Sequence, residues 1–416
     1  MTFQKRKKQD ILSNPDSDSP PSSLPLDKAD FALDAMPGQA LHDILRGYRE
    51  RGPVTRTRFL TRPALIITGH AELLDGFKDI ERFPPHRMYQ ASFEGAIGES
   101  FISMEDPERH RIYRKLATPA FRSRAVASYE AEGLTALAEE LALELVGRGS
   151  FDLMTDYAAR FPYRVIAGLL GLPREREDAF HDWALALLRF RDDPDAAKEA
   201  SRELTAFLAP VVESRRSVPC NDVITELVQA KVEGKALADD EIYSHVRLLL
   251  PTGGETTHGS LGNLLYALLS HEGLWHRLGR NRQEIAGAVD EALRWESPIA
   301  VLPRMSCGVD TEFHGVKIPA NSWVLFAMAG ANRDPAIFDQ PDRFDIARNN
   351  SESLSFGRGV KACPGSHLAK KNLLVAVEAL LDQLPSLKLL HPEEALPQRS
   401  VLRCPAALQV CSDRLI

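Results

Sequence analysis

Residues 356–365 form the segment FGRGVKACPG, in which Cys363 follows two glycines and stands just before a predicted helix. Glycines let a backbone turn tightly and approach a flat ligand closely, and Pro364 suits the first position of a helix. A cysteine at the amino end of a helix meets the positive end of the helix dipole, which stabilises a thiolate able to bind iron. Taken alone, such a cysteine is more often a buried structural residue. The full pattern F-x-x-G-x-[basic]-x-C-x-G favours haem binding.

This segment resembles the haem-binding loop of the cytochrome P450 superfamily, and further motifs occur in that family's order over nearly the whole chain after residue 25. The resemblance implies a triangular single domain, mainly α with a small β portion. It implies a haem b group with Cys363 as the iron ligand and with Phe356 and Gly365 in the cofactor-binding loop. The implied activity is hydroxylation of a small hydrophobic substrate with O2.

An acid and an alcohol, Glu255 and Thr256, stand together in the segment TGGETT that begins at Thr252. Pro251 and the two glycines after Thr252 weaken the helix around them, and such a kink opens backbone carbonyls to water or ligand. An isolated pair of this kind would more simply be a solvated acid and a helix-bonded alcohol. By resemblance to the family's [AG]-G-x-[DE]-T motif, Glu255 and Thr256 are the catalytic pair that relays protons. Thr252 departs from that motif, because the family usually has Ala or Gly there.

A second acid, Glu291, lies three residues before Arg294, so both side chains face one side of a helix. Such a pair is usually a surface feature of little energetic weight. The family has an E-x-x-R motif here that a later basic residue closes, and the resemblance assigns that position to Arg343 within PDRF. Its implied role is structural.

Four basic residues are assigned to the haem propionates by resemblance. They are His110, Arg114, Arg304 and Lys361. His110 and Arg114 are one helical turn apart, and Lys361 keeps the charge of the usual His or Arg without the planar fork. Each residue by itself could equally be an ordinary surface charge.

The substrate-facing segments are placed by resemblance only, and core packing is the alternative for each. The pocket residues expected in this way are Leu249, Gly253, Ile299, Val301, Leu302, Val401 and Leu402. They are largely apolar, which suits a terpenoid, aromatic, steroid or fatty compound.

Basic residues also surround the cysteine, with no acid between Ser353 and Asn372. These are Arg358, Lys361, Lys370 and Lys371. A basic patch on an acidic protein would steer an acidic partner, and a ferredoxin that receives electrons from NAD(P)H through a ferredoxin reductase fits it. An ordinary solvated face is the alternative.

The composition limits the remaining classes of protein. The chain has 416 residues and a net charge of −7, which does not favour nucleic-acid binding. Its five cysteines show no C-x-x-C spacing and so indicate neither disulfides nor zinc fingers, which favours the cytoplasm. No apolar run reaches the roughly 18 residues of a membrane span. We therefore expect no membrane anchor, and the family resemblance implies a monomer.

The hydrophobic pattern predicts a polar tail over residues 1–25 and a single domain over residues 26–416. A hairpin is expected from Val54 to Thr68 with its break at Thr61–Pro63. Strands are expected at Ala300–Met305, Val316–Ile318 and Ser322–Ala327, with a buried apolar run from Trp323 to Ala331. Helices are expected at Tyr129–Val146, Asp178–Leu188, Leu204–Val212, Asp239–Ser270, Arg282–Trp295 and Ser366–Leu384.

Two other functions compete with the monooxygenase. A peroxide-driven haem-thiolate enzyme often lacks the acid–alcohol pair, so Glu255 and Thr256 argue against it. A haem-based sensor or ligand binder needs neither a proton relay nor an electron partner, and it would bind carbon monoxide without giving an NADH-linked product.

Overall fold

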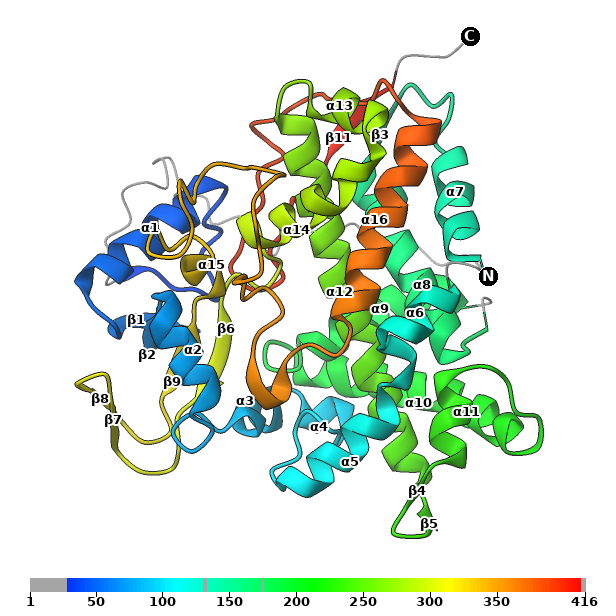
Figure 1. The fold of residues 1–416 in the computed structure, drawn as a ribbon. Coiled ribbons are helices and arrows are strands. Elements are labelled where there is room, and N and C mark those ends of the chain that lie inside the picture. Colours follow the sequence, from blue (N-terminus) through cyan, green and yellow to red (C-terminus); the bar gives the residue numbers. More distant parts are fainter. Residues whose placement is uncertain (1–27, 130–132, 174–175, 413–416) are drawn as a thin grey trace.

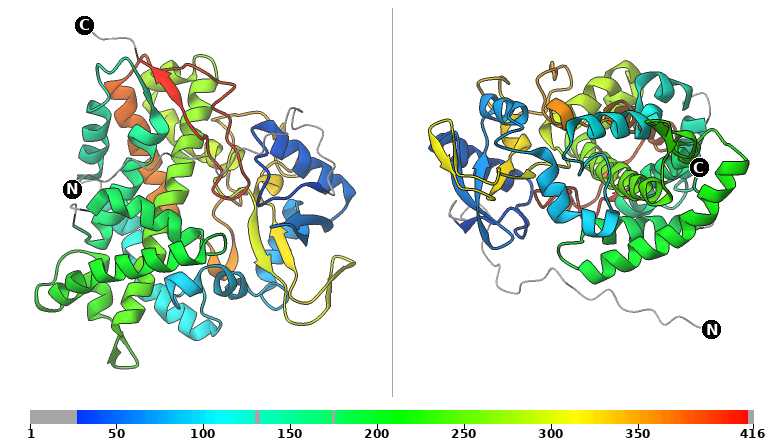
Figure 2. Two further views of the ribbon diagram at one scale, coloured as in Figure 1. Left: turned by 180° about the vertical axis from the view of Figure 1, so that it is seen from behind. Right: turned by 90° about the horizontal axis from the view of Figure 1, so that it is seen from below.

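The computed structural model describes residues 28–129, 133–173 and 176–412. The predicted tail, residues 1–25, lies outside them. Helices make up one large part of the molecule, and a smaller part rich in β-strands lies beside it (Figure 1). Figure 2 shows the same division from behind and from below. The prediction of a mainly α fold with a small β portion is confirmed.

The helices follow one another along most of the chain. Their bounds are α1 (Gln39–Arg51), α2 (His70–Lys78), α3 (Pro85–Ser92), α4 (Glu94–Ile97), α5 (Pro107–Ala117), α6 (Ser123–Tyr129), α7 (Thr135–Leu143), α8 (Arg160–Leu170), α9 (Glu177–Leu188), α10 (Pro194–Ser217), α11 (Val223–Gln229), α12 (Asp239–Ser270), α13 (Leu274–Arg280), α14 (Ile285–Trp295), α15 (Met328–Ala331) and α16 (Ser366–Gln383). Shorter helical turns include η5 (Met154–Ala158), η7 (Arg282–Glu284) and η8 (Gly359–Lys361).

The strands form small sheets. Their bounds are β1 (Thr55–Phe59), β2 (Arg62–Ile67), β3 (Ser150–Asp152), β4 (Lys231–Val232), β5 (Lys235–Ala236), β6 (Leu302–Met305), β7 (Thr311–Phe313), β8 (Val316–Ile318), β9 (Trp323–Phe326), β10 (Lys388–Leu389) and β11 (Gln409–Cys411). The main sheet has the order β1-β2-β9-β6, with β2 parallel to β9 and its other pairs antiparallel. A second sheet, β10-β11-β3, brings the C-terminal part of the chain beside residue 150.

The centre of the main sheet, formed by β9 and the second half of β2, is buried on both faces. The period of two along these strands decides which side chain meets which helix. Ile66 of β2 packs in one apolar cluster with residues of α1, whereas Ile67 packs in another with residues of α2. On β9, Leu325 and Phe326 divide between the same two clusters. The sheet therefore joins α1 and α2 into one lobe.

Helix α12 runs through the largest apolar cluster and contacts α8, α9, α14 and α16. It spans Asp239–Ser270 without a break, so the expected kink at Pro251 does not end the helix. The glycines of its middle turns have a packing role instead. A Cβ atom at Gly254 would lie 2.6 Å from the ring of Tyr163 on α8. Gly254 therefore lets α8 approach α12 closely.

Three distant segments meet at the buried carboxylate of Glu296, which follows α14. His42 on α1 lies 3.1 Å from it, Arg333 lies 3.7 Å away, and Arg403 forms a further ion pair with it. Burial and then the charge of Arg333 lower the pKa of His42 to about 4, so His42 is neutral at pH 7 and donates a hydrogen bond. Burial alone would raise the pKa of Glu296, but Arg403 and His42 lower it to about 2. The cluster fixes α1 to the C-terminal segment.

Most predicted elements are present with shifted ends. The hairpin is β1–β2, α12 has the predicted bounds, and α7 is shorter than expected; residues 130–132 of that prediction lie outside the described residues. The apolar run from Trp323 to Ala331 is one strand only as far as Phe326 and then becomes α15. The Ala-rich sequence after Phe326 explains this difference, because alanine favours helix.

Candidate active site

The loop before α16 carries Cys363, whose backbone N–H and thiol both take part in hydrogen bonds within the loop. The Cys363 N–H donates to the carbonyl of Phe356 at 2.9 Å, and the Gly365 N–H donates to the Cys363 thiol. Gly359 has φ +75°, and a Cβ atom there would lie 2.8 Å from the carbonyl oxygen of Phe77. The sequence therefore needs glycine where the loop passes over α2.

The thiol of Cys363 has opposing influences on its pKa. Burial raises the pKa, while the Gly365 N–H and the positive charge of Arg114 lower it by less, so the net direction is upward. The side chain is nevertheless solvent-accessible, as happens when a residue faces a recess and protein surrounds the rest of it. The expected stabilisation by backbone N–H groups is present, but it does not lower the pKa in the protein alone. A bound metal cation deprotonates a coordinating thiol outright.

Helix α5 positions two of the predicted propionate-binding residues beside this loop. Asp106 caps the helix by accepting the Arg109 N–H at 2.6 Å, and His110 and Arg114 follow on one face. Arg114 donates to the carbonyl of Ala362, next to the cysteine, at 2.5 Å. The Nε2 atom of His110 is buried and has no hydrogen-bond partner among the described residues.

Arg304 and Lys361 are the other two residues predicted to bind the propionates. Arg304 on β6 is only 4% exposed, and its guanidinium donates to the Pro303 carbonyl at 3.3 Å. Lys361 donates to the carbonyls of Phe101 and Ile102 at 2.7 and 2.9 Å. Burial, and then the charges of Arg114 and Arg304, lower the pKa of Lys361 to about 7. Burial, and then the charges of Lys361 and Arg114, lower the pKa of His110 to about 4, so this imidazole is neutral at pH 7 without a ligand. Within the described residues, no carboxylate pairs with Arg114, Arg304 or Lys361, so the two propionates of a haem would supply the negative charge that these side chains lack.

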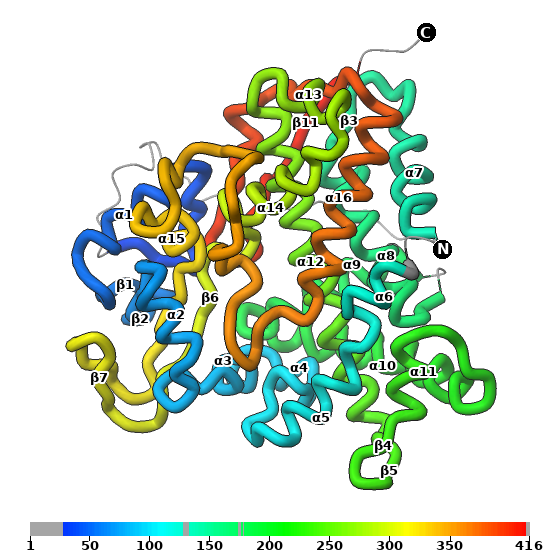
Figure 3. Tube along the Cα trace, viewed as in Figure 1, coloured from blue at the N-terminus to red at the C-terminus, as the bar shows by residue number. Residues whose placement is uncertain are grey.

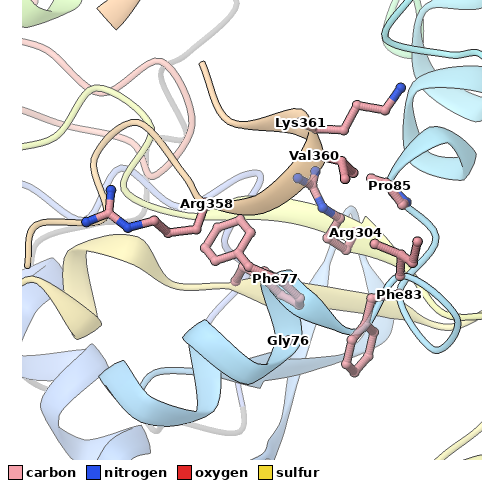
Figure 4. A pocket seen from close by; sticks show the side chains of 10 residues that line it. Gly76, Phe77, Phe83, Pro85, Arg304, Arg358, Val360 and Lys361 are labelled. Carbon is pink, nitrogen blue, oxygen red and sulfur yellow. The ribbon is translucent and has the colours of Figure 1, made fainter. Parts of the chain in front are cut away.

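A small pocket adjoins the loop on the side of α2 (Figure 4). Arg304, Phe77 and Phe83 line it together with loop residues. Figure 4 shows that Arg358 and Lys361 point away from one another along the loop. Arg358 donates to the Ser351 carbonyl at 3.0 Å. Arg304, Lys361 and Arg358 thus line the same pocket, but the guanidinium of Arg358 binds the backbone of residue 351.

The acid and the alcohol of α12 have separate partners. The Thr256 hydroxyl donates to the Thr252 carbonyl at 2.7 Å, as does the Thr252 hydroxyl to the carbonyl of Leu248. The Glu255 carboxylate is buried and accepts from the hydroxyl of Tyr163 at 2.9 Å. Thr252, which departs from the family motif, is therefore accommodated as a helix-bonded side chain.

His181 on α9 is the second partner of Glu255, with Nε2 2.9 Å from its carboxylate. Burial alone would raise the pKa of Glu255, but the hydrogen bond from His181 and the charges of His181 and His258 hold that pKa well below its usual range. Sequence reasoning missed these partners. The spacing of His258, three residues after Glu255, was a signal, whereas Tyr163 and His181 come from other helices and gave none.

The E-x-x-R pair is fully buried rather than a surface feature. Arg294 and Glu291 form two hydrogen bonds of 2.7 and 2.8 Å, and Arg294 also donates to the carbonyls of Asn332 and Pro341. The prediction that Arg343 closes the motif is wrong, because its side chain is exposed and only its carbonyl is used.

Arg348 supplies the basic side chain instead, with Nε 3.2 Å from the Glu291 carboxylate. Figure 3 traces the irregular chain that carries it from α15 towards the loop before α16. Both arginines lie in that irregular stretch, where no periodicity indicates which side chain turns inward.

The structure brings together some of the residues expected to face the substrate. Ile299 pairs with Val401 as an isolated β-bridge, and the Val301 N–H donates to the Ser400 carbonyl at 3.0 Å. Leu302 is half-buried on β6, and Leu402 has φ +54° in the C-terminal turn.

Three of those residues are better explained by packing. Val301 is fully buried in the cluster around α1, and Leu249 is buried in the cluster around α12. A Cβ atom at Gly253 would lie 2.9 Å from the side chain of Ile166 on α8. These positions hold elements together, which is the alternative that the sequence left open.

Two of the basic side chains predicted to form a patch around Cys363 have partners within the protein. Lys370 forms an ion pair of 2.7 Å with Asp290 on α14, with both side chains exposed by more than 40%. Lys361 is turned inward to backbone carbonyls. Part of the positive charge around the cysteine is therefore directed into the protein or neutralised.

Comparisons with known proteins agree with this geometry. Residues 188–411 match the family described as Cytochrome P450. Over 304 residues, the chain is 34% identical to the steroid C26-monooxygenase of Mycobacterium tuberculosis (strain CDC 1551 / Oshkosh), covering 72% of this chain and 81% of that protein. It is 32% identical to the vitamin D(3) 25-hydroxylase of Pseudonocardia autotrophica, covering 84% of this chain and 87% of that protein.

A solved structure, cytochrome P450 CYP109Q5 from Chondromyces apiculatus, aligns with a TM-score of 0.83 and 28% identity, covering 93% of this chain and 99% of that chain. The chain therefore belongs to the cytochrome P450 family, and its activity is that of a cytochrome P450 monooxygenase. Membership implies a haem b cofactor. No helix in the described part of the chain combines the length and apolar character of a membrane span.

Proposed function

We propose that Cys363 binds the haem iron and that the enzyme hydroxylates a small hydrophobic substrate. The electrons would come from NAD(P)H through a ferredoxin reductase and a ferredoxin. The observation that carries the proposal is the group of His110, Arg114, Arg304 and Lys361 around the cysteine loop, which has no carboxylate partner among the described residues. A dianionic flat ligand would supply the missing charge.

The cofactor-binding residues hold the haem in this proposal. Phe356 and Gly365 fix the loop through their backbone contacts to Cys363. The arginines offer planar groups that suit carboxylates, and His110 offers its unpartnered Nε2. When bound, the haem supplies the activation of O2, which protein side chains cannot provide.

The residues of α12 would supply the protons that the chemistry of a bound haem consumes. His181, whose side chain is 35% exposed and so reaches solvent, hydrogen-bonds the ionised carboxylate of Glu255. Because the pKa of Glu255 lies well below its usual range, this carboxylate would pass a proton on without retaining it. Thr256 lies next along the helix, and its hydroxyl exchanges its bond to the Thr252 carbonyl for one to a water or ligand. Glu255 and Thr256 thus remain the proposed catalytic pair.

We propose a steroid or another rigid apolar compound as the substrate class. Two relatives at 32–34% identity carry names that describe steroid and vitamin D(3) hydroxylation. Ile299 and Val401 pair as a β-bridge, and Leu302 and Leu402 add further apolar side chains on the same two segments, which suits such a ligand. The enzyme is further proposed to act in the cytoplasm as a monomer.

The haem proposal is tested with purified wild type and Cys363→Ala, with Cys307→Ala as the matched control. Cys307 follows β6, and its thiol donates to the Val309 carbonyl. We expect wild type and Cys307→Ala to give the carbon monoxide spectrum of a reduced thiolate-bound haem, and Cys363→Ala to lose it. Normal pigment and turnover in Cys363→Ala would refute the proposal.

Substrate and electron supply need a second experiment. A panel of steroids, terpenoids, aromatics and fatty acids is screened by the shift of the haem absorption band when water leaves the iron. Turnover of the best ligand is then measured with NADH, reductase and ferredoxin, and separately with peroxide. Product formed only with peroxide would contradict the ferredoxin proposal, and a shift with fatty acids alone would contradict the steroid class.

A further inference from the structure

Three side chains with metal-binding atoms meet between α9 and α12. They are His181, Glu255 and His258, and their ligand atoms all lie within 4.8 Å of one another. His181 Nε2 is 2.9 Å from one Glu255 oxygen, and His258 Nδ1 is 3.7 Å from the other. Each oxygen of the carboxylate therefore faces one imidazole.

Two imidazoles and one carboxylate form a donor set that zinc and related ions prefer. Glu255 and His258 stand three residues apart on one helix, and Glu-x-x-His at this spacing directs both side chains to one metal in helical carboxylate proteins. His181 adds the third ligand from α9. Fewer than four protein ligands leave a position for water.

His258 supplies an independent reason to expect a ligand. Both of its ring nitrogens are buried and have no hydrogen-bond partner within the described ranges. At 3.7 Å the Glu255 oxygen is too far from Nδ1 for a hydrogen bond. A buried polar group without a partner costs free energy. A cation between His258 and Glu255 would satisfy one nitrogen and bring the two side chains into contact.

The surroundings suit a cation as well. Glu255 is 7% exposed and is further oriented by the hydroxyl of Tyr163, in the manner of outer groups that hold metal-binding carboxylates. His258 is 14% exposed and His181 is 35% exposed, so solvent reaches the cluster from the His181 side. The carboxylate needs no deprotonation at neutral pH, since its pKa lies far below its usual range.

We propose that His181, Glu255 and His258 form a binding site for a divalent transition-metal ion such as Zn²⁺. The site is separate from Cys363 and would tie α9 to α12 while it occupies the carboxylate. This inference goes beyond the monooxygenase function and does not depend on the haem being bound at Cys363.

The test titrates Zn²⁺ into the haem-loaded protein by isothermal calorimetry. A Cys220→Ser background removes an exposed thiol that also binds this ion. We expect His258→Ala and His181→Gln each to weaken binding by more than about tenfold, because even changes to outer-shell groups commonly cost that much. The carbon monoxide spectrum of each variant checks that it is folded.

The matched control is His391→Ala. His391, Glu393 and Glu394 form a second candidate group, but all three are exposed. We expect this variant to bind Zn²⁺ as tightly as the parent. Unchanged binding in both His258→Ala and His181→Gln, or loss of binding in His391→Ala alone, would overturn the proposal.

Turnover gives a second measurement that separates this proposal from the catalytic role of Glu255. If Glu255 moves protons, Zn²⁺ should slow turnover of the parent and slow His258→Ala much less at the same concentration. Tight Zn²⁺ binding that leaves turnover unchanged would uphold the metal site and count against the proton role.

Discussion

Arg348 and Arg343 lie in the same irregular stretch, and only one of their side chains reaches the buried Glu291. Arg348 is 11% exposed and has its Nε 3.2 Å from that carboxylate. It also donates to the carbonyls of Asp339, Gln340 and Arg343 at 2.5 to 3.2 Å. The Arg343 side chain is exposed. Replacement of the two arginines should therefore have very different effects on stability.

The expected magnitudes follow from these contacts. Hydrogen bonds to a charged group contribute about 1.5–3 kcal/mol, and near the surface the carbonyls regain water, so Arg348→Ala should cost about 2–3 kcal/mol. Arg343→Ala should stay within about 0.5 kcal/mol, as exposed positions do. Arg294→Ala leaves Glu291 buried without its closest partner and should cost the most, about 3–5 kcal/mol.

The assay is urea unfolding of the haem-loaded protein, followed by circular dichroism and by the haem band. The free energy of unfolding should rank wild type and Arg343→Ala first, then Arg348→Ala, then Arg294→Ala. Arg348→Lys should fall between wild type and Arg348→Ala, because lysine keeps the charge and loses the fork. If Arg343→Ala were as destabilising as Arg348→Ala, the assignment of the buried contact would be mistaken.

Three further changes test other parts of the molecule. Gly359→Ala places a side chain at φ +75° against a backbone carbonyl and should lower the free energy of unfolding by about 1–3 kcal/mol, with partial loss of haem. Gly308→Ala is the control, because a Cβ atom there meets no atom within 4 Å. Equal unfolding midpoints of the two variants would contradict this prediction. The pKa of His42 is about 4 in the folded protein and 6.5 in its ordinary, exposed state. Between these two pH values the unfolded chain binds more protons than the folded protein, so this residue should lower the free energy of unfolding by about 2 kcal/mol from about pH 7 to about pH 5. His42→Leu should flatten that dependence in urea titrations, and an unchanged slope would refute the cause. Lys370→Glu with Lys371→Glu should slow stopped-flow reduction by ferredoxin at low salt and less so at high salt; equal rates at every salt concentration would remove the docking proposal.

Local sequence determines the elements better than it determines their partners. The period of α12 gives its bounds from Asp239 to Ser270, and the glycines before Cys363 indicate the turn that Gly359 makes. The pairing of β11 with β3 escapes prediction because strands of three residues carry too little pattern and their partners lie far apart in the chain. The long α10 was foreseen only around Leu204–Val212, because its residues on either side of that range are mostly polar or charged and carry little apolar periodicity.

The residues of the site likewise fall into those that the sequence identifies and those that it does not. Cys363 and its loop are a contiguous motif, and so sequence is enough to single them out. Arg348 and His181 could not be assigned from sequence, because each acts through a residue about 57 or 74 positions away along the chain. The packing of α9 on α12 determines that His181 contacts Glu255. The position of the irregular stretch beside α14 determines that Arg348 contacts Glu291.

The distribution of buried charge gives the strongest physical argument for where the cofactor lies. Arg294 is buried and has Glu291, and Arg403 is buried and has Glu296. Arg304 is 4% exposed, yet no carboxylate lies near it among the described residues. A buried unpaired charge is costly unless a ligand compensates it. The fold thus pairs its structural arginines internally and leaves positive charge uncompensated beside the cysteine loop, where two carboxylates of a bound cofactor would stabilise it.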